Sequence, residues 1–337
     1  MLSGVPLATQ PADLVGDLPG DFTARVTDLL DRVEQRLAEA ARADTDFVTE
    51  AAQHIIHAGG KRFRPLLVVL AALLAAEPDE EAVVRAALVM ELTHVASLYH
   101  DDVMDEAQLR RGAPSANQRW DNTVAILVGD FLFSRASSIV ATLGTDYVTL
   151  QANTFARLVQ GQIAETRGPK AGADLLEHYL EVLADKTGSL IAASAIFGGM
   201  VAGVGERELR ALDAYGEEIG MVFQLSDDIL DIASDSSGKT PGTDLRAGVP
   251  TLPTLLARRS TDPADARLLA LLDADLSADA DLAEALGLMR AHPAMTEARE
   301  EIRRRAEVAR AHLAPLPDGP AKTALAALCD GVISRSA

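Results

Sequence analysis

The sequence is poor in cysteine, in aromatic side chains and in positive charge. Cys329 is the only cysteine among the 337 residues, so no intramolecular disulfide and no thiolate metal cluster can form. Aromatic residues make up 4% of the chain, and Lys and Arg total 31 against 50 Asp and Glu, which gives a formal net charge of -19. Because nucleic acids and anionic lipid surfaces are bound by clustered Lys and Arg, this balance argues against nucleic-acid binding and against electrostatic docking to membranes.

The sequence also has no apolar run of membrane-spanning length. The most apolar stretch, Leu190 to Val204, is about 15 residues long, whereas about 20 are needed to cross a bilayer. We assign this stretch to a buried central helix. The N-terminal region has no basic segment followed by an apolar run, so no signal peptide is predicted. We therefore expect a protein of the reducing cytoplasm, with no stable membrane anchor.

The composition that remains is typical of packed helices. Ala and Leu recur throughout, while strand propensity belongs to aromatic and β-branched residues. Apolar residues at three- and four-residue spacing, as in Val26 to Leu37 and Leu66 to Ala76, indicate helices. Hydrophobic residues make up 48% of the chain, enough for a large core, and no linker divides it. We predict an all-α fold with one domain over residues 21–337, preceded by a loose arm over residues 1–20.

One long irregular stretch runs from Asp235 to Pro253 and is rich in glycine and proline. A compact domain rarely keeps so long a loop without a use, and lids or binding loops are the common reason. We therefore expect a lid or a binding loop in this stretch.

Two acidic triplets with the same spacing stand in apolar helical surroundings, the first at the end of an amphipathic helix predicted to begin near Asp79. They are Asp101, Asp102 and Asp105 in HDDVMDE, and Asp227, Asp228 and Asp231 in LSDDILDI. Residues four apart share a helical face, and carboxylates this close repel by about 4 kcal/mol at 4 Å for an effective dielectric of 20. Helix caps or solvated acidic faces would predict charged neighbours, whereas the flanking residues are Leu, Val and Ile. Two such ledges facing each other would hold magnesium ions around a diphosphate.

Basic residues gather at two places. Lys61, Arg62 and Arg64 lie in GGKRFRP, and Arg110 and Arg111 lie in LRRG. Arg offers a planar fork for bidentate contacts with phosphate and Lys offers a point charge, so both clusters suit diphosphate oxygens. The alternative for either cluster is surface salt bridging within an acidic protein.

Five sequence blocks occur in the order and at the spacing of one family. They are GGKRFRP, HDDVMDEAQLRRG, DKTGSL, FQLSDDILD and GKTPGTDLRAGVPTLP. In these blocks the chain resembles the all-trans polyprenyl diphosphate synthases, and the resemblance extends from about Phe22 to the C-terminal region. It implies an isoprenoid synthase helical bundle with a central active-site cavity, a homodimer, and two substrates, isopentenyl diphosphate and an allylic diphosphate.

The resemblance also implies a role for particular residues. Both acidic triplets would bind magnesium, three ions per active site, and these six aspartates and Lys186 would be the catalytic residues. The expected contacts of the allylic diphosphate are Arg110, Lys186, Thr187, Gln224 and Lys239. The expected metal-free pocket for isopentenyl diphosphate consists of Lys61, Arg64, His94 and Arg111. Without the resemblance, His94 would be interpreted as a core histidine. Many members carry a second lysine at the position of Val249, and this chain departs from them there.

The residues just before the first triplet bear on product length. Ser97 lies one turn before Asp101 and Ala96 lies beside it, and a helical turn of about 5.4 Å is comparable to one isoprene unit. Short-chain members carry bulky aromatic residues there, so these small side chains predict a medium or long product of about six to nine units. Such products form menaquinone tails and grow from farnesyl or geranylgeranyl diphosphate. The alternative within the family is a short-chain geranylgeranyl diphosphate synthase.

Two other kinds of protein would share some of these features. A terpene cyclase has an aspartate-rich first motif, but its second metal motif mixes Asn, Ser and Glu, and it needs no isopentenyl pocket. A non-catalytic partner subunit usually loses one aspartate cluster or the basic motif. This chain retains both acidic triplets and GGKRFRP.

Overall fold

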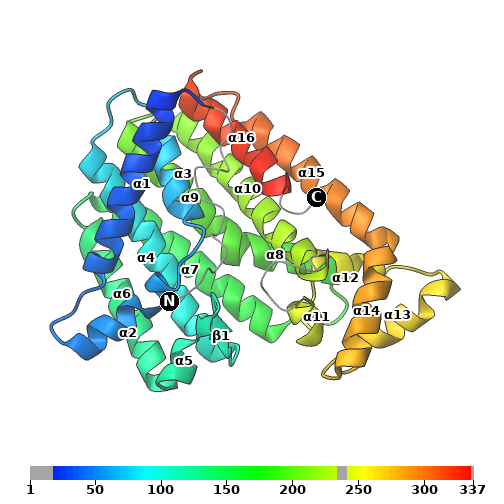
Figure 1. Ribbon diagram of the computed structural model, residues 1–337. Coiled ribbons are helices and arrows are strands. Elements are labelled where there is room, and N and C mark those ends of the chain that lie inside the picture. Colours follow the sequence, from blue (N-terminus) through cyan, green and yellow to red (C-terminus); the bar gives the residue numbers. More distant parts are fainter. Residues whose placement is uncertain (1–17, 234–240, 335–337) are drawn as a thin grey trace. The chain divides into compact units, whose positions relative to one another are not determined.

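The computed structural model describes residues 18–233 and 241–334, and helices make up almost all of its regular structure (Figure 1). The prediction of an all-α fold is confirmed. Besides a two-residue hairpin of β1 (Leu109–Arg110) and β2 (Ala113–Pro114), the elements are α1 (Gly20–Ala40), α2 (Asp46–His57), α3 (Phe63–Ala72), α4 (Glu80–Met104), α5 (Ala116–Arg119), α6 (Asn122–Val140), α7 (Thr145–Arg167), α8 (Leu175–Leu183), the π-helix η2 (Ala184–Gly188), α9 (Ser189–Ala202), α10 (Glu206–Ala233), α11 (Thr243–Arg246), α12 (Leu252–Ala257), the 3₁₀-helix η3 (Pro263–Asp265), α13 (Ala266–Leu272), α14 (Asp279–Ala291), α15 (Pro293–His312) and α16 (Pro320–Ser334).

The chain groups into two compact units. The first unit comprises Met1–Ala156, Leu190–Gly216 and His312–Leu328, and the second comprises Arg157–Ser189, Glu217–Ala311 and Cys329–Ala337. A single domain over residues 21–337 stays a prediction. Of the predicted loose arm, residues 1–17 lie outside the described residues, and α1 begins at Gly20.

The helix that carries the first acidic triplet, α4, is the centre of the first unit. Asp79 caps its start by accepting hydrogen bonds from the backbone N–H groups of Glu81 (3.0 Å) and Ala82 (3.1 Å), which confirms the predicted beginning near this residue. The predicted amphipathic character is wrong, because every residue from Ala86 to Thr93 is buried. The reason is that α1, α3 and α6 all pack against α4, so that no side of this segment faces solvent.

The apolar stretch near residue 190 is α9, which the structure confirms as a buried helix. It approaches α3 so closely at Gly198 that a Cβ atom there would lie 2.3 Å from the carbonyl oxygen of Val68 and 2.7 Å from the Cβ of Ala71. Only glycine fits such a helix contact without displacing a backbone.

The predicted irregular stretch over residues 235–253 contains more regular structure than expected. Its described part includes α11 and the first turn of α12. Asp231 at the end of α10 accepts hydrogen bonds from the backbone N–H groups of Thr243 (3.0 Å) and Asp244 (3.1 Å), so it stabilises the first turn of α11. Pro253 lies in the first turn of α12, where its missing N–H costs no helical hydrogen bond.

The expectation that no apolar run reaches membrane-spanning length is wrong, because two described helices, α4 and α6, are long and apolar enough to cross a membrane by length and composition alone. The apolar window of α4 is 78% buried and that of α6 is 33% buried. A core helix of a soluble protein meets the same criteria, so α4 is explained by its packing. The exposed apolar face of α6 requires another explanation, given below.

Substituting Gly198→Ala tests the contact between α9 and α3. The added methyl group overpacks this contact, so we expect the free energy of unfolding to fall by about 1 to 3 kcal/mol in chemical denaturation. Gly287→Ala in α14 is the control, because a Cβ atom at Gly287 meets no atom within 4 Å. Its stability should stay equal or rise, since Ala favours helices. An unchanged stability of Gly198→Ala would contradict the close approach.

Candidate active site

The first acidic triplet lies at the C-terminal end of α4, in the first unit. Asp102 is fully buried, and its Oδ1 accepts a hydrogen bond from the Nε of Arg110 at 2.6 Å, because the β1–β2 hairpin turns the chain back toward the helix. Burial raises the pKa of Asp102, and the hydrogen bond from Arg110 opposes this rise. The Oδ2 of Asp102 is buried and has no hydrogen-bond partner within the described structure. A buried carboxylate oxygen without a donor is suited to a cation.

Three of the four residues of the expected isopentenyl diphosphate pocket lie in the same unit, and two of them, Arg64 and Arg111, are buried cations whose charges act on the third, His94. The Nε of Arg64 is buried and has no hydrogen-bond partner among the described residues. Burial lowers the pKa of Arg64 to about 10, and it lowers the pKa of Arg111 as well. The pKa of His94 lies well below its usual range, because of burial first and of the Arg64 and Arg111 charges next, so this imidazole is neutral. Buried cations with so little compensation favour the binding of an anion.

The Gly59–Gly60 turn of GGKRFRP holds this pocket together. Arg111 donates from Nη1 to the carbonyl oxygens of Gly59 and of Ile55, the latter at 3.1 Å. Gly60 has a φ of 147°, and a Cβ atom there would lie 2.8 Å from the guanidinium groups of Arg62 and Arg111. The glycine is therefore required both by its backbone conformation and by the room that the two arginines take. Lys61 follows directly in the turn before α3.

The second acidic triplet lies on α10 in the second unit. Asp228 and Asp231 form hydrogen bonds with residues of other segments. Asp228 is buried and accepts hydrogen bonds from the Tyr179 hydroxyl and from the backbone N–H of Leu252 (3.3 Å). Burial is the main cause that raises the pKa of Asp228 to about 7. Gln224 lies one turn earlier, with its Nε2 3.5 Å from the Oδ1 of Asp228. Asp231 stabilises α11, as described above.

Lys186 and Thr187 lie in the π-helix η2, between α8 and α9. Single π turns within helices are rare and are frequent at functional sites. This turn packs tightly against α7, since a Cβ atom at Gly161 would lie 2.8 Å from the backbone nitrogen of Lys186. Arg157 fixes it further through a 2.6 Å bond from its Nε to Asp185. The Nζ of Lys186 donates to Glu165 at 2.6 Å.

The remaining predicted residues are placed as follows. Ala96 and Ser97 are buried in α4, and the hydroxyl of Ser97 donates to the carbonyl oxygen of His94 at 2.8 Å. Val249 is 44% exposed in the segment between α11 and α12. Lys239 lies outside the described residues. The structure thus brings the first triplet together with Arg110, and the second with Gln224. That the two triplets face each other stays a prediction.

Several residues that contact or neighbour the predicted site residues could not be identified from the sequence. Tyr179 bonds Asp228 from α8, and Glu165 pairs with Lys186 from α7. Arg62, noted only as part of a basic run, pairs with Glu34 and Glu91. These partners come from separate helices, so no local spacing indicates them.

A family model described as polyprenyl synthetase matches residues 45–289 of this chain. The chain belongs to this family. Nonaprenyl diphosphate synthase from Mycobacterium tuberculosis is 49% identical over 330 residues, which cover 96% of this chain and 98% of that protein. Dimethylallyltranstransferase from the same organism is 41% identical over 325 residues, with 96% and 98% covered. Among solved structures, geranylgeranyl pyrophosphate synthase from Corynebacterium glutamicum, in complex with calcium and isoprenyl diphosphate, is 43% identical with a TM-score of 0.85 and covers 95% of this chain and 98% of that one.

As a polyprenyl synthetase, the chain is a prenyltransferase, so the resemblance drawn from its motifs is confirmed. The terpene cyclase alternative is set aside by the same match. The first acidic triplet and the Arg64, His94 and Arg111 group in the first unit, and the second acidic triplet in the second unit, are the candidate functional residues of this polyprenyl synthetase.

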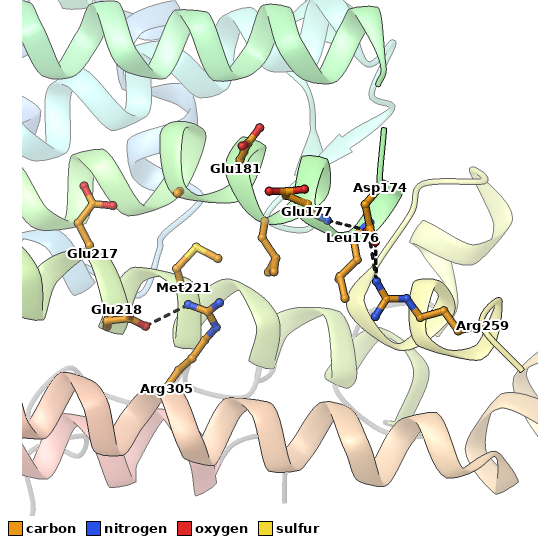
Figure 2. Close-up of a pocket in the computed structure, with 11 residues that line it drawn as sticks. Asp174, Leu176, Glu177, Glu181, Glu217, Glu218, Met221, Arg259 and Arg305 are labelled. Carbon is orange, nitrogen blue, oxygen red and sulfur yellow. Dashed lines mark hydrogen bonds and ion pairs between the residues drawn. The ribbon is translucent and has the colours of Figure 1, made fainter. Parts of the chain in front are cut away.

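A cavity of about 510 Å³ in the second unit is a poor site for the diphosphates that polyprenyl synthetases use (Figure 2). Arg259 pairs with Asp174 at 3.0 Å, and Arg305 pairs with Glu218 at 3.1 Å. The acidic side chains that line it are Asp174, Glu177, Glu181, Glu217 and Glu218. A diphosphate there would meet an excess of negative charge, because five acidic side chains and only two arginines line the cavity.

The residues of the acidic triplets would fit a divalent metal ion that takes part of its ligands from outside the protein. Among the described residues, no three His, Cys, Asp or Glu side chains form a group that would hold a metal by themselves. Magnesium commonly takes one or two protein carboxylates and completes its octahedron with waters and substrate phosphates. The unpaired Oδ2 of Asp102 agrees with such an incomplete set of ligands.

Substituting Asp228→Asn tests the buried carboxyl in the metal-free protein. With a pKa of about 7 in the folded state and an ordinary value of 3.8, Asp228 binds more protons in the folded than in the unfolded state between these pH values. The free energy of unfolding should therefore fall as the pH rises from about 4 to about 7, by about 1.4 kcal/mol for each unit of pKa shift. Asp228→Asn should lack this component. Urea denaturation with a chelator present measures it, and equal pH slopes for both proteins would contradict it.

Proposed function

We propose that this polyprenyl synthetase condenses isopentenyl diphosphate with an allylic diphosphate, farnesyl or geranylgeranyl diphosphate, and makes a medium or long all-trans polyprenyl diphosphate. The observation that carries the proposal is the buried cluster of Arg64, His94 and Arg111 in the first unit. Arg64 and Arg111 are held there beside a neutral His94, and a buried nitrogen of Arg64 has no partner in the described structure. A metal-free diphosphate is the ligand that such a pocket suits best. Lys61 completes it.

The reaction begins with ionisation of the allylic carbon–oxygen bond. The isopentenyl double bond then attacks the allylic cation, which forms the new carbon–carbon bond. The former isopentenyl unit then loses a proton and regains a double bond. Magnesium would be held by Asp101, Asp102, Asp105, Asp227, Asp228 and Asp231, and it would supply positive charge where the departing diphosphate becomes more negative. The diphosphate itself is contacted by Arg110, Lys186, Thr187, Gln224 and Lys239.

Arg110 and Lys186 are paired with carboxylates in the structure, and binding of the allylic diphosphate replaces these pairs. Arg110 bonds Asp102, and Lys186 bonds Glu165. The carboxylates hold these cations in position, so that neither cation is buried without a counter-ion before the substrate binds. No side-chain nucleophile takes part.

Small side chains support a product of about six to nine isoprene units, since each helical turn spans about one unit. Ala96 and Ser97 leave room before the first triplet, and the 49% identical relative is named nonaprenyl diphosphate synthase. Such a product fits a menaquinone side chain made in the cytoplasm. The second candidate is a short-chain geranylgeranyl diphosphate synthase, which the 43% identical structure from Corynebacterium glutamicum favours.

The exposed apolar face of α6 supports a homodimer. Ile126 is 43% exposed and Leu127 is 60% exposed on this helix. Only 33% of the apolar window of α6 is buried, and an apolar surface of this kind is typical of an interface. A second copy of the chain covers this face.

Product analysis of the purified chain tests the proposed function. Farnesyl diphosphate and labelled isopentenyl diphosphate should give a product of about six to nine units on thin-layer chromatography, without a companion subunit. In Ala96→Phe the ring fills the space before the first triplet, so its product should be shorter by at least one unit. Circular dichroism checks that the variant is folded. A wild-type product of fifteen or twenty carbons would favour the short-chain candidate, and equal products from both proteins would contradict the location of the cavity.

Substituting Leu127→Arg tests the dimer. Burying an unpaired guanidinium in the interface is costly, so the variant should elute as a monomer of 35.6 kDa in size-exclusion chromatography with light scattering, while the unaltered protein has twice this mass. Leu288→Arg in α14 is the control, because Leu288 is also exposed and should leave the dimer intact. A dimeric Leu127→Arg protein, or a monomeric unaltered protein, would contradict the assignment.

A further inference from the structure

Two guanidinium groups meet at the Gly59–Gly60 turn. Arg62 donates from Nη1 to the carbonyl oxygen of Gly59 at 3.1 Å, and Arg111 donates from its own Nη1 to the same oxygen. Arg62 adopts a left-handed backbone conformation with φ of 47°, which turns its side chain back over the turn. Like charges this close need nearby anions to be stable together.

Carboxylates on two helices supply these negative charges to Arg62. Its Nε and Nη2 donate to Glu34 of α1 at 2.6 and 2.8 Å. Its Nη1 lies 3.1 Å from the Oε1 of Glu91 of α4, a side chain that is only 2% exposed. The charge of Arg62 is therefore neutralised by two carboxylates, whereas Arg64, two residues later, has a buried Nε without a hydrogen-bond partner in the described structure.

Glu91 is the critical partner, because a buried carboxylate must pair with some cation. Its negative charge reaches the pocket, since it opposes the lowering of the pKa of both Arg64 and Arg111. If Arg62 were absent, these two guanidinium groups would be available to pair with Glu91, since its charge already acts on both. They are also the groups expected to bind the diphosphate of isopentenyl diphosphate.

We infer that Arg62 is a positioning residue that holds Glu91 away from Arg64 and Arg111 and so keeps their guanidinium groups available to isopentenyl diphosphate. This inference rests on the proposed function. In this arrangement Arg62 neutralises Glu34 and Glu91, so that the charges of Arg64 and Arg111 are not neutralised by Glu91.

A double-mutant cycle of Arg62→Met and Glu91→Gln tests the inference. Arg62→Met should raise KM for isopentenyl diphosphate by about tenfold or more, since a released buried carboxylate competes for the pocket. Its kcat and its KM for the allylic diphosphate should change by less than about twofold. Arg62→Met combined with Glu91→Gln should recover most of the loss, because the competing charge is gone. A double variant that binds isopentenyl diphosphate as poorly as Arg62→Met would overturn the inference and leave Arg62 a merely structural residue.

Controls separate this effect from a general loss of stability. Arg32→Met removes an arginine that also joins α1 to two glutamates, Glu80 and Glu81, but at the surface, and it should leave both KM values unchanged. Arg62→Lys keeps the charge beside Glu91 and should keep KM within about threefold. Thermal unfolding reports whether each variant is folded.

Binding of inorganic pyrophosphate in the presence of a chelator separates the two claims. Calorimetric titration should show weaker binding to Arg62→Met and recovery in the double variant, whether or not the protein turns over. Absence of elongation by the wild-type protein would overturn the proposed function alone. Equal pyrophosphate binding by the wild type and Arg62→Met would overturn the role of Arg62 alone.

Discussion

The separation of opposite charges within the first unit is the constraint on which the candidate site depends. The chain has a formal net charge of -19, and its proposed substrates are themselves anionic. Its cations are readily neutralised by neighbouring carboxylates, as Arg157 is by Asp185 and Glu217. A pocket for a diphosphate has to keep some cations out of such pairs, which costs desolvation energy and needs rigid surroundings. The helices packed around Arg64 provide these rigid surroundings.

Packing around helix ends and tight turns supplies that rigidity. Asp102 and Asp228 are both buried carboxyls with raised pKa values, and each is bonded to a residue from another segment. The Gly59–Gly60 turn and the π turn at Lys186 reach their conformations because glycines allow neighbouring groups to approach. Asp102, Arg62 and Lys186 thus lie where a regular helix ends, begins or changes its winding.

The sequence predicted the helical class, the start of α4 and the family, because these follow from composition, capping and motifs that are local in the chain. It did not predict that α4 is buried on every side, since burial depends on which helices surround it. The helical turn of α11 was missed because it is stabilised by Asp231 from α10, across an interval that no local pattern links. The role of Arg62 was missed for the same reason, as Glu34 and Glu91 come from two different helices.

The central claim is that a cationic pocket binds isopentenyl diphosphate without metal while the aspartates bind the allylic diphosphate only through metal. Calorimetric titration of each diphosphate into the protein, once with a chelator and once with magnesium, tests it most directly. The account predicts that isopentenyl diphosphate binds under both conditions with similar affinity, and that farnesyl diphosphate binds tightly only with magnesium. Binding of isopentenyl diphosphate that requires magnesium, or tight binding of farnesyl diphosphate in the chelator, would contradict it.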